Sequence, residues 1–225
     1  TFRETKRSFD PVTVQSRLQS KGISVLTWND EKYPPYLKQI AQPPPVLYCL
    51  GVFSEADNLA MAIVGTRNVT SYGKQLCHDT ATYLAGHGVA IVSGLARGVD
   101  AIAHRAALEI GGRTVAVLGS GVDVIYPPEH RKLAEAIIKS GVVISDYPPG
   151  TKPEGINFPP RNRIISGLSR GTIVIEAGER SGALITAKFA VEQGRDVFAV
   201  PGSVLSAMSK GTNNLIGEGA IPMTN

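Results

Sequence analysis

The sequence has little of what disulfide-bonded, zinc-binding or membrane proteins need. Its 225 residues include only two cysteines, Cys49 and Cys77, and four histidines. The cysteines form no CxxC pair, so we expect neither a disulfide framework nor a metal site. No apolar run approaches the roughly 20 residues of a membrane-spanning helix, and no signal peptide is visible. These absences favour a protein of the reducing cytoplasm with no membrane partner.

Two common nucleotide-binding fingerprints are also missing. No GxxxxGK[ST] segment occurs, which argues against a P-loop NTPase. GSGVDV, residues 119–124, begins like GxGxxG, but Val124 stands at the third glycine, and the segment follows the third expected core strand instead of the first. We therefore expect no nucleotide cofactor.

Acidic residues are missing from NFPPRNRIISGLSRG, residues 157–171, which reads as the opening of a helix. Arginines at a helix N-terminus oppose the helix dipole, at a cost of a few tenths to about 1 kcal/mol each. Arg163 and Arg170 share one helix face, whereas Arg161 points elsewhere. We expect Arg161 and Arg163 to touch a bound anion or brace the loop that does, and Arg170 to be a surface or structural residue.

From about residue 60 onward, the order of apolar and helical segments in the sequence is typical of an α/β protein. Each continuous apolar run is followed by a glycine-containing turn and a helical stretch, as is typical of parallel strands covered on both faces. The runs are Met61 to Gly65, Val89 to Gly94, Thr114 to Gly119, Val142 to Ser145, Thr172 to Ala177 and Asp196 to Gly202. The expected helices are 71–87, 100–110, 129–139, 161–170, 182–194 and 211–218. The pattern predicts an α/β, Rossmann-like, doubly wound and mostly parallel sheet of about six strands.

The first 55 residues differ from the rest in proline content and in the length of their expected elements. Proline clusters at 34–35 and 43–45 prevent a continuous helix and separate short elements such as GISVLTW, residues 22–28. We expect residues 1–55 to form an N-terminal extension that packs on the core, with a strand that joins the sheet edge. Residues 56–225 are expected to form the core.

The loops after the apolar runs hold the candidate binding residues, because ligands of open α/β sheets bind beyond the carboxyl ends of the strands. Four of these loops combine glycines, hydroxyl groups and cations, which are the groups that hold phosphates. After the second run, Ser93 and Gly94 are expected to present free backbone N–H groups. The loops supply Gly65, Thr66, Arg67, Ser93, Gly94, Arg97, Lys152, Phe158, Arg161 and Arg163.

Catalytic interpretations have less support. Asp100 and His104 lie four residues apart on one expected helix face, with Ser93 nearby in sequence, but a nucleophile elbow would need glycine at Ile91. A hydrogen-bonded Asp100–His104 pair that fixes the turn is the simpler interpretation. Glu176, at the end of a strand, is either the base of a hydrolase or an acceptor of hydrogen bonds around its loop.

Several motifs together resemble the DNA-processing protein A family, also called DprA or Smf. The resemblance runs from about residue 60 to the C-terminus and keeps the order and spacing of the family. The motifs are VGTR, IVSGLARGVDAIAHRAAL, GGRTVAVLGSGVDVIYPPEH, SDYPPGTKP, NFPPRNRIISGLSRGTIVIEA, RSGALITA and GRDVFAVPGS. The resemblance implies an extended Rossmann fold without enzymatic activity that binds and protects single-stranded DNA and loads the RecA recombinase onto it during natural transformation.

The resemblance also implies roles for particular residues. Arg67 would lie in the phosphate pocket of the family, and Phe158 would stack on a base. Pro128 stands where some relatives carry lysine, so Arg131 or Lys132 would replace that contact. Leu215 and Ile216, on the last core helix, would belong to a homodimer or RecA interface. The implied DNA-binding set is Gly65, Thr66, Arg67, Ser93, Gly94, Arg97, Lys152, Phe158, Arg161, Asn162 and Arg163.

Two other functions remain open at this point. One is a Rossmann-like nucleotide or sugar-phosphate hydrolase related to the phosphoribohydrolases, with Glu176 as its carboxylate. Those enzymes have a key loop that resembles PGGxGTxxE, and EAGERSGALITA, residues 176–187, does not match this pattern. The other is a structural or regulatory dimer, which predicts no salt-sensitive binding of single strands.

Overall fold

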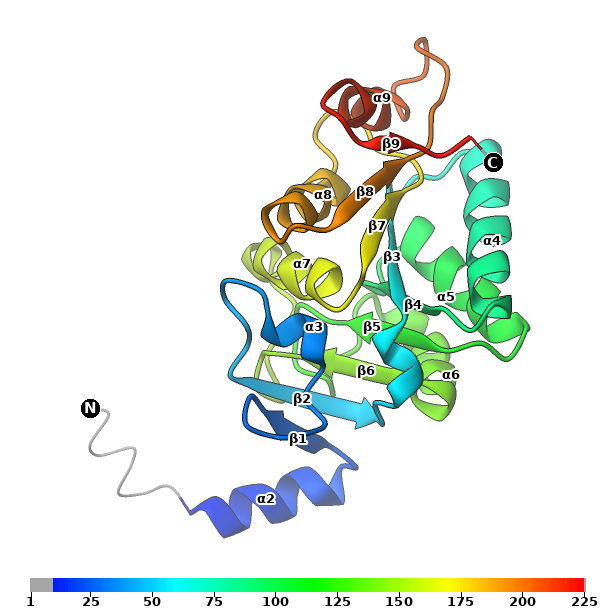
Figure 1. Cartoon of the computed structure of the whole chain (residues 1–225). Coiled ribbons are helices and arrows are strands. Elements are labelled where there is room, and N and C mark those ends of the chain that lie inside the picture. The colour runs from blue at the N-terminus through cyan, green and yellow to red at the C-terminus, as the bar shows by residue number, and fades with distance from the viewer. Residues whose placement is uncertain (1–9, 225) are drawn as a thin grey trace.

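A nine-stranded sheet with helices on both faces forms the body of the protein (Figure 1). The computed structural model describes residues 10–224. The strands are β1 (Ser24–Thr27), β2 (Val46–Gly51), β3 (Ala60–Val64), β4 (Ala90–Ser93), β5 (Thr114–Val117), β6 (Val142–Ser145), β7 (Gly171–Val174), β8 (Asp196–Ala199) and β9 (Ile221–Pro222). Their order in the sheet is β1-β2-β6-β5-β4-β3-β7-β8-β9.

The strands from β6 to β9 along the sheet are parallel, and their order reverses beside β3. From β3 the chain moves through β4 and β5 to β6 on one side, and it then crosses to β7 and β8 on the other. A reversal of this kind opens a crevice at the carboxyl ends of the two strands that flank it. The predicted α/β, Rossmann-like fold is confirmed, and the six expected core strands are all present.

Helices cover both faces of the sheet because alternate strand residues point to opposite sides. Ala62 and Val64 of β3 pack in one buried cluster with residues of α7 and α8, while Ile63 packs in a second cluster with residues of α4 and α5. The helices are α2 (Pro11–Ser20), α3 (Pro35–Lys38), α4 (Ser71–Gly86), α5 (Val99–Glu109), α6 (Arg131–Ser140), α7 (Phe158–Gly167), α8 (Gly182–Glu192) and α9 (Lys210–Gly217). Three short 3₁₀ helices, Glu55–Asn58, Pro128–His130 and Gly155–Asn157, lie between these elements.

The N-terminal segment joins the sheet edge, as expected for one of its strands. β2 pairs antiparallel with β6, and β1 pairs antiparallel with β2. Leu37 and Ile40 follow the prolines of α3 and pack against α7 at Gly167, where an added Cβ would lie 3.0 Å from each side chain. The division into an extension of residues 1–55 and a core of 56–225 stays a prediction, and residues 1–9 lie outside the described part of the chain.

Helix α7 begins three residues earlier than predicted, at Phe158, and ends at Gly167. Prolines are tolerated in a first helical turn because the N–H groups there have no partner within the helix. Arg170 consequently lies beyond the helix, and its N–H donates to Ala60 O at 2.8 Å. Its guanidinium carbon lies 5.2 Å from the centroid of the Tyr36 ring. Arg170 is thus exposed and packs on Tyr36, which agrees with the expected surface or structural residue.

Candidate nucleic-acid interface

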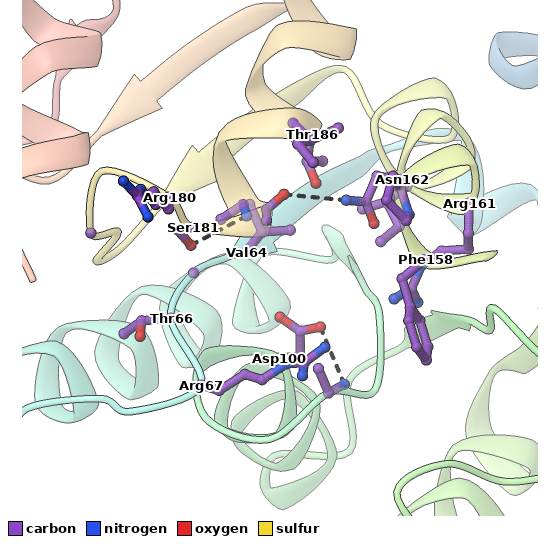
Figure 2. Close-up of a pocket in the computed structure, with 18 of the residues that line it drawn as sticks. Val64, Thr66, Arg67, Asp100, Phe158, Arg161, Asn162, Arg180, Ser181 and Thr186 are labelled. Carbon is purple, nitrogen blue, oxygen red and sulfur yellow. Dashed lines mark hydrogen bonds between the residues drawn. The ribbon is translucent and has the colours of Figure 1, made fainter. Parts of the chain in front are cut away.

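A pocket of about 750 Å³ opens where the strand order reverses, at the carboxyl ends of β3, β4 and β7 (Figure 2). We call it the arginine pocket. Its lining comes from the loops after these strands, from the first turns of α7 and α8, and from the loops that follow β5, β6 and β8. The residues used below are Gly65, Thr66, Arg67, Ala96, Asp100, Tyr126, Phe158, Arg161, Asn162, Arg180, Ser181, Gly182 and Met208.

The loop after β3 is held against the end of β7. The Thr66 N–H donates to Glu176 O at 2.7 Å, and the Glu176 carboxylate accepts from Thr70 N at 3.0 Å and from Thr70 Oγ1 at 2.6 Å. A Cβ at Gly65 would lie 2.6 Å from Val99 Cγ2, so only glycine allows this close crossing. The buried Glu176 is thus an acceptor within the loop framework, which is the structural one of its two interpretations.

The charge of the pocket is predominantly positive. Its lining contains three arginines and one carboxylate. Arg67 and Arg180 are exposed, and neither forms an ion pair with another residue in the range 10–224. The carboxylate, Asp100, is buried and accepts from Gly94 N at 3.1 Å and Ala96 N at 3.2 Å. Two cationic side chains on opposite walls are therefore available to an anion.

Arg161 is buried beneath the pocket, with 5% of its surface exposed. Its Nη1 donates to Gly94 O at 2.8 Å and to Val117 O. Burial lowers the pKa of Arg161 to about 10, while the attraction of Asp100 acts against that shift. Arg161 therefore joins α7 to the ends of β4 and β5. Through Nη1, Arg161 has the bracing contacts that were one of its two expected roles, and its side chain also lines the pocket.

Two aromatic rings lie together at one side of the pocket. The ring centroids of Tyr126 and Phe158 are 5.8 Å apart and tilted by 34°. Phe158 is half-buried against Gly119, and the guanidinium carbon of Arg67 lies 6.0 Å from its ring centroid. Phe158 thus presents part of an aromatic face beside an exposed cation, an arrangement that suits a nucleobase next to its phosphate.

The start of α8 forms the wall that carries Arg180. Ser181 caps the helix by accepting from Ala183 N at 3.3 Å. Asn162 Nδ2 donates to Gly182 O at 3.2 Å and ties this turn to α7 (Figure 2). A helix N-terminus beside an arginine favours negative charge, because the helix dipole places its positive end there.

The backbone after β4 differs from the prediction. Ser93 is buried and its Oγ donates to Ile63 O at 2.6 Å, while the Gly94 N–H is occupied by Asp100. The Gly94 N–H is thus not available to a ligand, because the buried Asp100 accepts from it. The prediction of a free N–H group at Gly94 was therefore wrong, whereas the one at Ser93 stays a prediction.

The expected Asp100–His104 pair was also wrong. His104 Nδ1 lies 2.6 Å from Thr114 Oγ1, which donates to Ile91 O at 2.7 Å. Because that hydroxyl hydrogen is used, Nδ1 carries the proton and donates to Thr114. Burial lowers the pKa of His104 to about 3, so the imidazole is neutral.

Three predicted cations lie outside the lining of the arginine pocket. Arg97 forms a 2.6 Å ion pair with Glu129, and Arg163 forms a 3.0 Å ion pair with Asp146. Lys152 is exposed on the loop between β6 and α7. The structure thus brings Arg67, Phe158 and Asn162 together and holds Arg97 and Arg163 in pairs beside them.

The last predicted pair of residues lies on another surface. Leu215 and Ile216 are half-buried on α9, and Leu215 packs against the sheet core. Leu215 also lines a cavity of about 760 Å³ between α8, α9 and β9.

Two pocket residues escaped the sequence interpretation. Arg180 belongs to the RSGALITA motif after β7, and its position beside an expected helix start was a usable signal. Tyr126 lies in a proline-rich turn whose path the sequence does not specify. Its proximity to Phe158 depends on how the loop after β5 folds back, so no local pattern could indicate it.

Within residues 10–224, no group of three or more His, Cys, Asp or Glu side chains could hold a metal ion. The same residues contain no helix that is both long and apolar enough to cross a membrane. Both cysteines are buried and free.

Comparison with known proteins identifies relatives of the whole chain. Protein Smf of Synechocystis sp. is 46% identical over 219 residues, which are 96% of this chain and 55% of the relative. The chain thus spans little more than half the length of that curated relative. DNA processing protein A from Streptococcus pneumoniae has a solved structure with a TM-score of 0.91 at 40% identity, covering 100% of this chain and 78% of that one.

A second solved structure, that of DNA processing protein A from Helicobacter pylori, has a TM-score of 0.81 at 33% identity and covers 90% of this chain and 91% of that one. That protein is described as having a unique single-stranded DNA binding mode. The family described as "DNA recombination-mediator protein A" matches residues 24–225. Because this match covers most of the chain, the chain belongs to the DNA recombination-mediator protein A family.

Proposed function

We propose that the chain binds single-stranded DNA in the arginine pocket and acts in DNA processing. The observation that carries this proposal is the pairing of exposed, unpaired Arg67 and Arg180 with the aromatic face of Phe158 in one pocket of the described chain. Arginines hold the backbone of a single strand and aromatic rings stack on its bases with little regard to sequence. The description of the Helicobacter pylori relative as a single-stranded DNA binder supports the same function.

The proposed contacts divide into direct and supporting groups. Arg67, Arg180 and the start of α8 hold phosphates, while Phe158 accepts a base. Gly65, Ser93, Gly94 and Arg161 hold the loops in place. Thr66 and Asn162 line the same pocket. Outside it, Lys152 adds positive charge, while Arg97 and Arg163 are held in ion pairs with Glu129 and Asp146.

Salt dependence tests this proposal. With about four phosphates neutralised, the logarithm of the affinity falls against the logarithm of salt concentration with a slope near −3, at about −0.7 per contact. The protein is titrated with oligo-dT and with duplex of equal length. Arg67→Glu is expected to remove most of the single-strand binding, while Arg17→Glu, on the distant and exposed α2, leaves it unchanged (Figure 1). A preference for duplex, or binding that survives Arg67→Glu, contradicts the proposal.

We further propose that the bound strand is protected and passed to the RecA recombinase in natural transformation, within the cytoplasm. The description of the family as recombination mediators supports this step. RecA filament formation on oligo-dT is expected to be faster in the presence of the chain and to lose that gain with Arg67→Glu. Nuclease digestion of the same complexes measures protection.

A homodimer through α9 is part of the proposal. Leu215 and Ile216 lie on that helix beside the short edge strand β9. Sedimentation of the wild type and of Ile216→Asp is the test, since a charge in an apolar interface separates the protomers. A monomeric wild type contradicts this part alone.

We propose no catalytic role for the pocket. Glu176, the candidate carboxylate of a phosphoribohydrolase, is buried and accepts two hydrogen bonds from Thr70. Release of free base from a nucleoside monophosphate is the discriminating assay. Turnover that Glu176→Gln abolishes would favour the hydrolase.

A further inference from the structure

The loop between β8 and α9 carries two aliphatic side chains that the rest of the chain does not cover. Val204 is 81% exposed and Leu205 is 92% exposed. The loop projects from the molecule at the top of Figure 1, between β8 and α9. Single exposed aliphatic residues are common on protein surfaces. Two adjacent exposed aliphatic side chains at the tip of a projecting turn indicate a binding surface if hydrogen bonds hold the turn in place.

Hydrogen bonds hold both the tip and the base of this turn. At the tip, Ser203 accepts from Leu205 N through Oγ at 3.2 Å and from Ser206 N through its carbonyl at 2.9 Å. At the base, Asn213 Oδ1 accepts from Gly202 N at 3.2 Å and Nδ2 donates to Gly202 O at 3.0 Å. The aliphatic side chains are therefore presented by an ordered framework that gains nothing from their apolar character.

The same loop forms part of the arginine pocket. Met208 lines the pocket, and its Sδ accepts from Thr66 Oγ1 at 3.7 Å. Leu205 precedes Met208 by three residues, so its Cα lies within roughly 11 Å of that pocket residue. A segment of only two residues thus separates the tip from the pocket that Arg67 and Arg180 line.

We propose that Val204 and Leu205 contact the bases of the single strand whose phosphates occupy the arginine pocket. This inference rests on the proposed function. Next to the base that stacks on Phe158, further bases of the bound strand extend past the pocket, and the uncharged tip offers them an apolar surface without repelling or attracting the backbone. Apolar side chains are known to insert against base steps in DNA complexes. Two side chains are too few for the core of a stable protein interface, which needs about 800 Å² per partner.

The test compares two ligands and two double variants. The ligands are oligo-dT and a sugar-phosphate oligomer of equal length without bases. Val204→Ser/Leu205→Ser is compared with Val12→Ser/Val52→Ser, which removes two aliphatic side chains that are each 70% exposed in the N-terminal segment. Thermal unfolding checks that every variant is folded, as expected for exposed positions.

The tip variant is expected to bind oligo-dT roughly tenfold more weakly, with an unchanged salt slope because no phosphate contact is lost. Its affinity for the base-free oligomer and both affinities of the control variant stay at wild-type values. Unchanged oligo-dT affinity, equal loss for both ligands, or a changed oligomeric state that marks the tip as a contact between protein copies overturns the inference.

The two proposals fail in different ways. Wild-type binding of oligo-dT that does not depend on Arg67 contradicts the arginine pocket itself. Binding that depends on Arg67 but not on the tip contradicts only the role of Val204 and Leu205.

Discussion

The guanidinium carbon of Arg161 lies 5.8 Å from the centroid of the Phe158 ring, so the buried cation supports the aromatic residue proposed to accept a base. The same guanidinium donates to the carbonyl groups of Gly94 and Val117. The α7 residue thus connects the proposed base-stacking ring with the ends of two central strands.

Arg161→Ala is expected to lower the free energy of unfolding by about 3 kcal/mol, because it leaves two carbonyl groups and the buried Asp100 without their donor or counter-charge. Urea unfolding measures this loss. Arg161→Lys keeps the charge but loses the planar guanidinium. Its free energy of unfolding is expected to lie between those of the wild type and of Arg161→Ala. If Arg161→Ala is as stable as the wild type and only its DNA affinity falls, Arg161 is a phosphate ligand after all.

Arg180→Ala is expected to weaken oligo-dT binding by roughly tenfold, or about 1.4 kcal/mol. Because one phosphate contact is lost, the slope of log affinity against log salt should become less negative by about 0.7. Fluorescence anisotropy across a salt series measures both quantities. Arg17→Ala is the matched control, and an Arg180 variant with a wild-type slope would place the strand away from α8.

Phe158→Leu is expected to reduce oligo-dT affinity by roughly 5- to 150-fold, since one base stack contributes about 1 to 3 kcal/mol. The salt slope should not change, because the side chain carries no charge. Tyr126→Phe, which keeps both rings, should bind as the wild type does. A parallel loss of slope in Phe158→Leu would mean that the variant displaces Arg67 and does not report on stacking.

His104 makes stability depend on pH. Its folded-state pKa of about 3 lies below the ordinary value of 6.5, so the unfolded chain takes up a proton that the folded protein excludes. The resulting stabilisation is present above pH 6.5 and is lost as pH falls toward 3. Between pH 7.5 and 5.5 the loss amounts to about 1.4 kcal/mol.

His104→Asn keeps a donor near Thr114 and removes the titration, so its free energy of unfolding should fall less over this interval. Urea unfolding at the two pH values gives the difference between the proteins. His78, whose pKa is raised chiefly by its hydrogen bond to Glu109, acts in the opposite direction but is the same in both. Identical pH dependence in the two proteins would show that His104 is not the group responsible.

The sequence predicted the parallel core because the runs around β3 to β8 are short, continuous and followed by glycine. It also predicted that the loops at their carboxyl ends would gather, as Arg67 and Phe158 do. It could not predict which polar groups would satisfy one another. The Gly94 N–H was predicted to be free, but Asp100, six residues further along the chain, accepts from it. For Arg161 both an anion contact and a bracing role were open, and its carbonyl partners Gly94 and Val117 lie 67 and 44 residues away. Periodicity carries no information about such side-chain partners.

The central position of β3 and β7 has a further consequence for how the chain opens. Every strand that supplies a loop to the arginine pocket is hydrogen-bonded to a neighbour on both sides, whereas the two outermost strands, β1 and β9, are bonded on one side only. Fluctuations that release backbone amides start where the fewest hydrogen bonds must break. The backbone amide hydrogens at the two ends of the sheet can therefore exchange with solvent while the pocket stays assembled. Single-stranded DNA in the pocket would lie on the part of the sheet whose amides exchange most slowly.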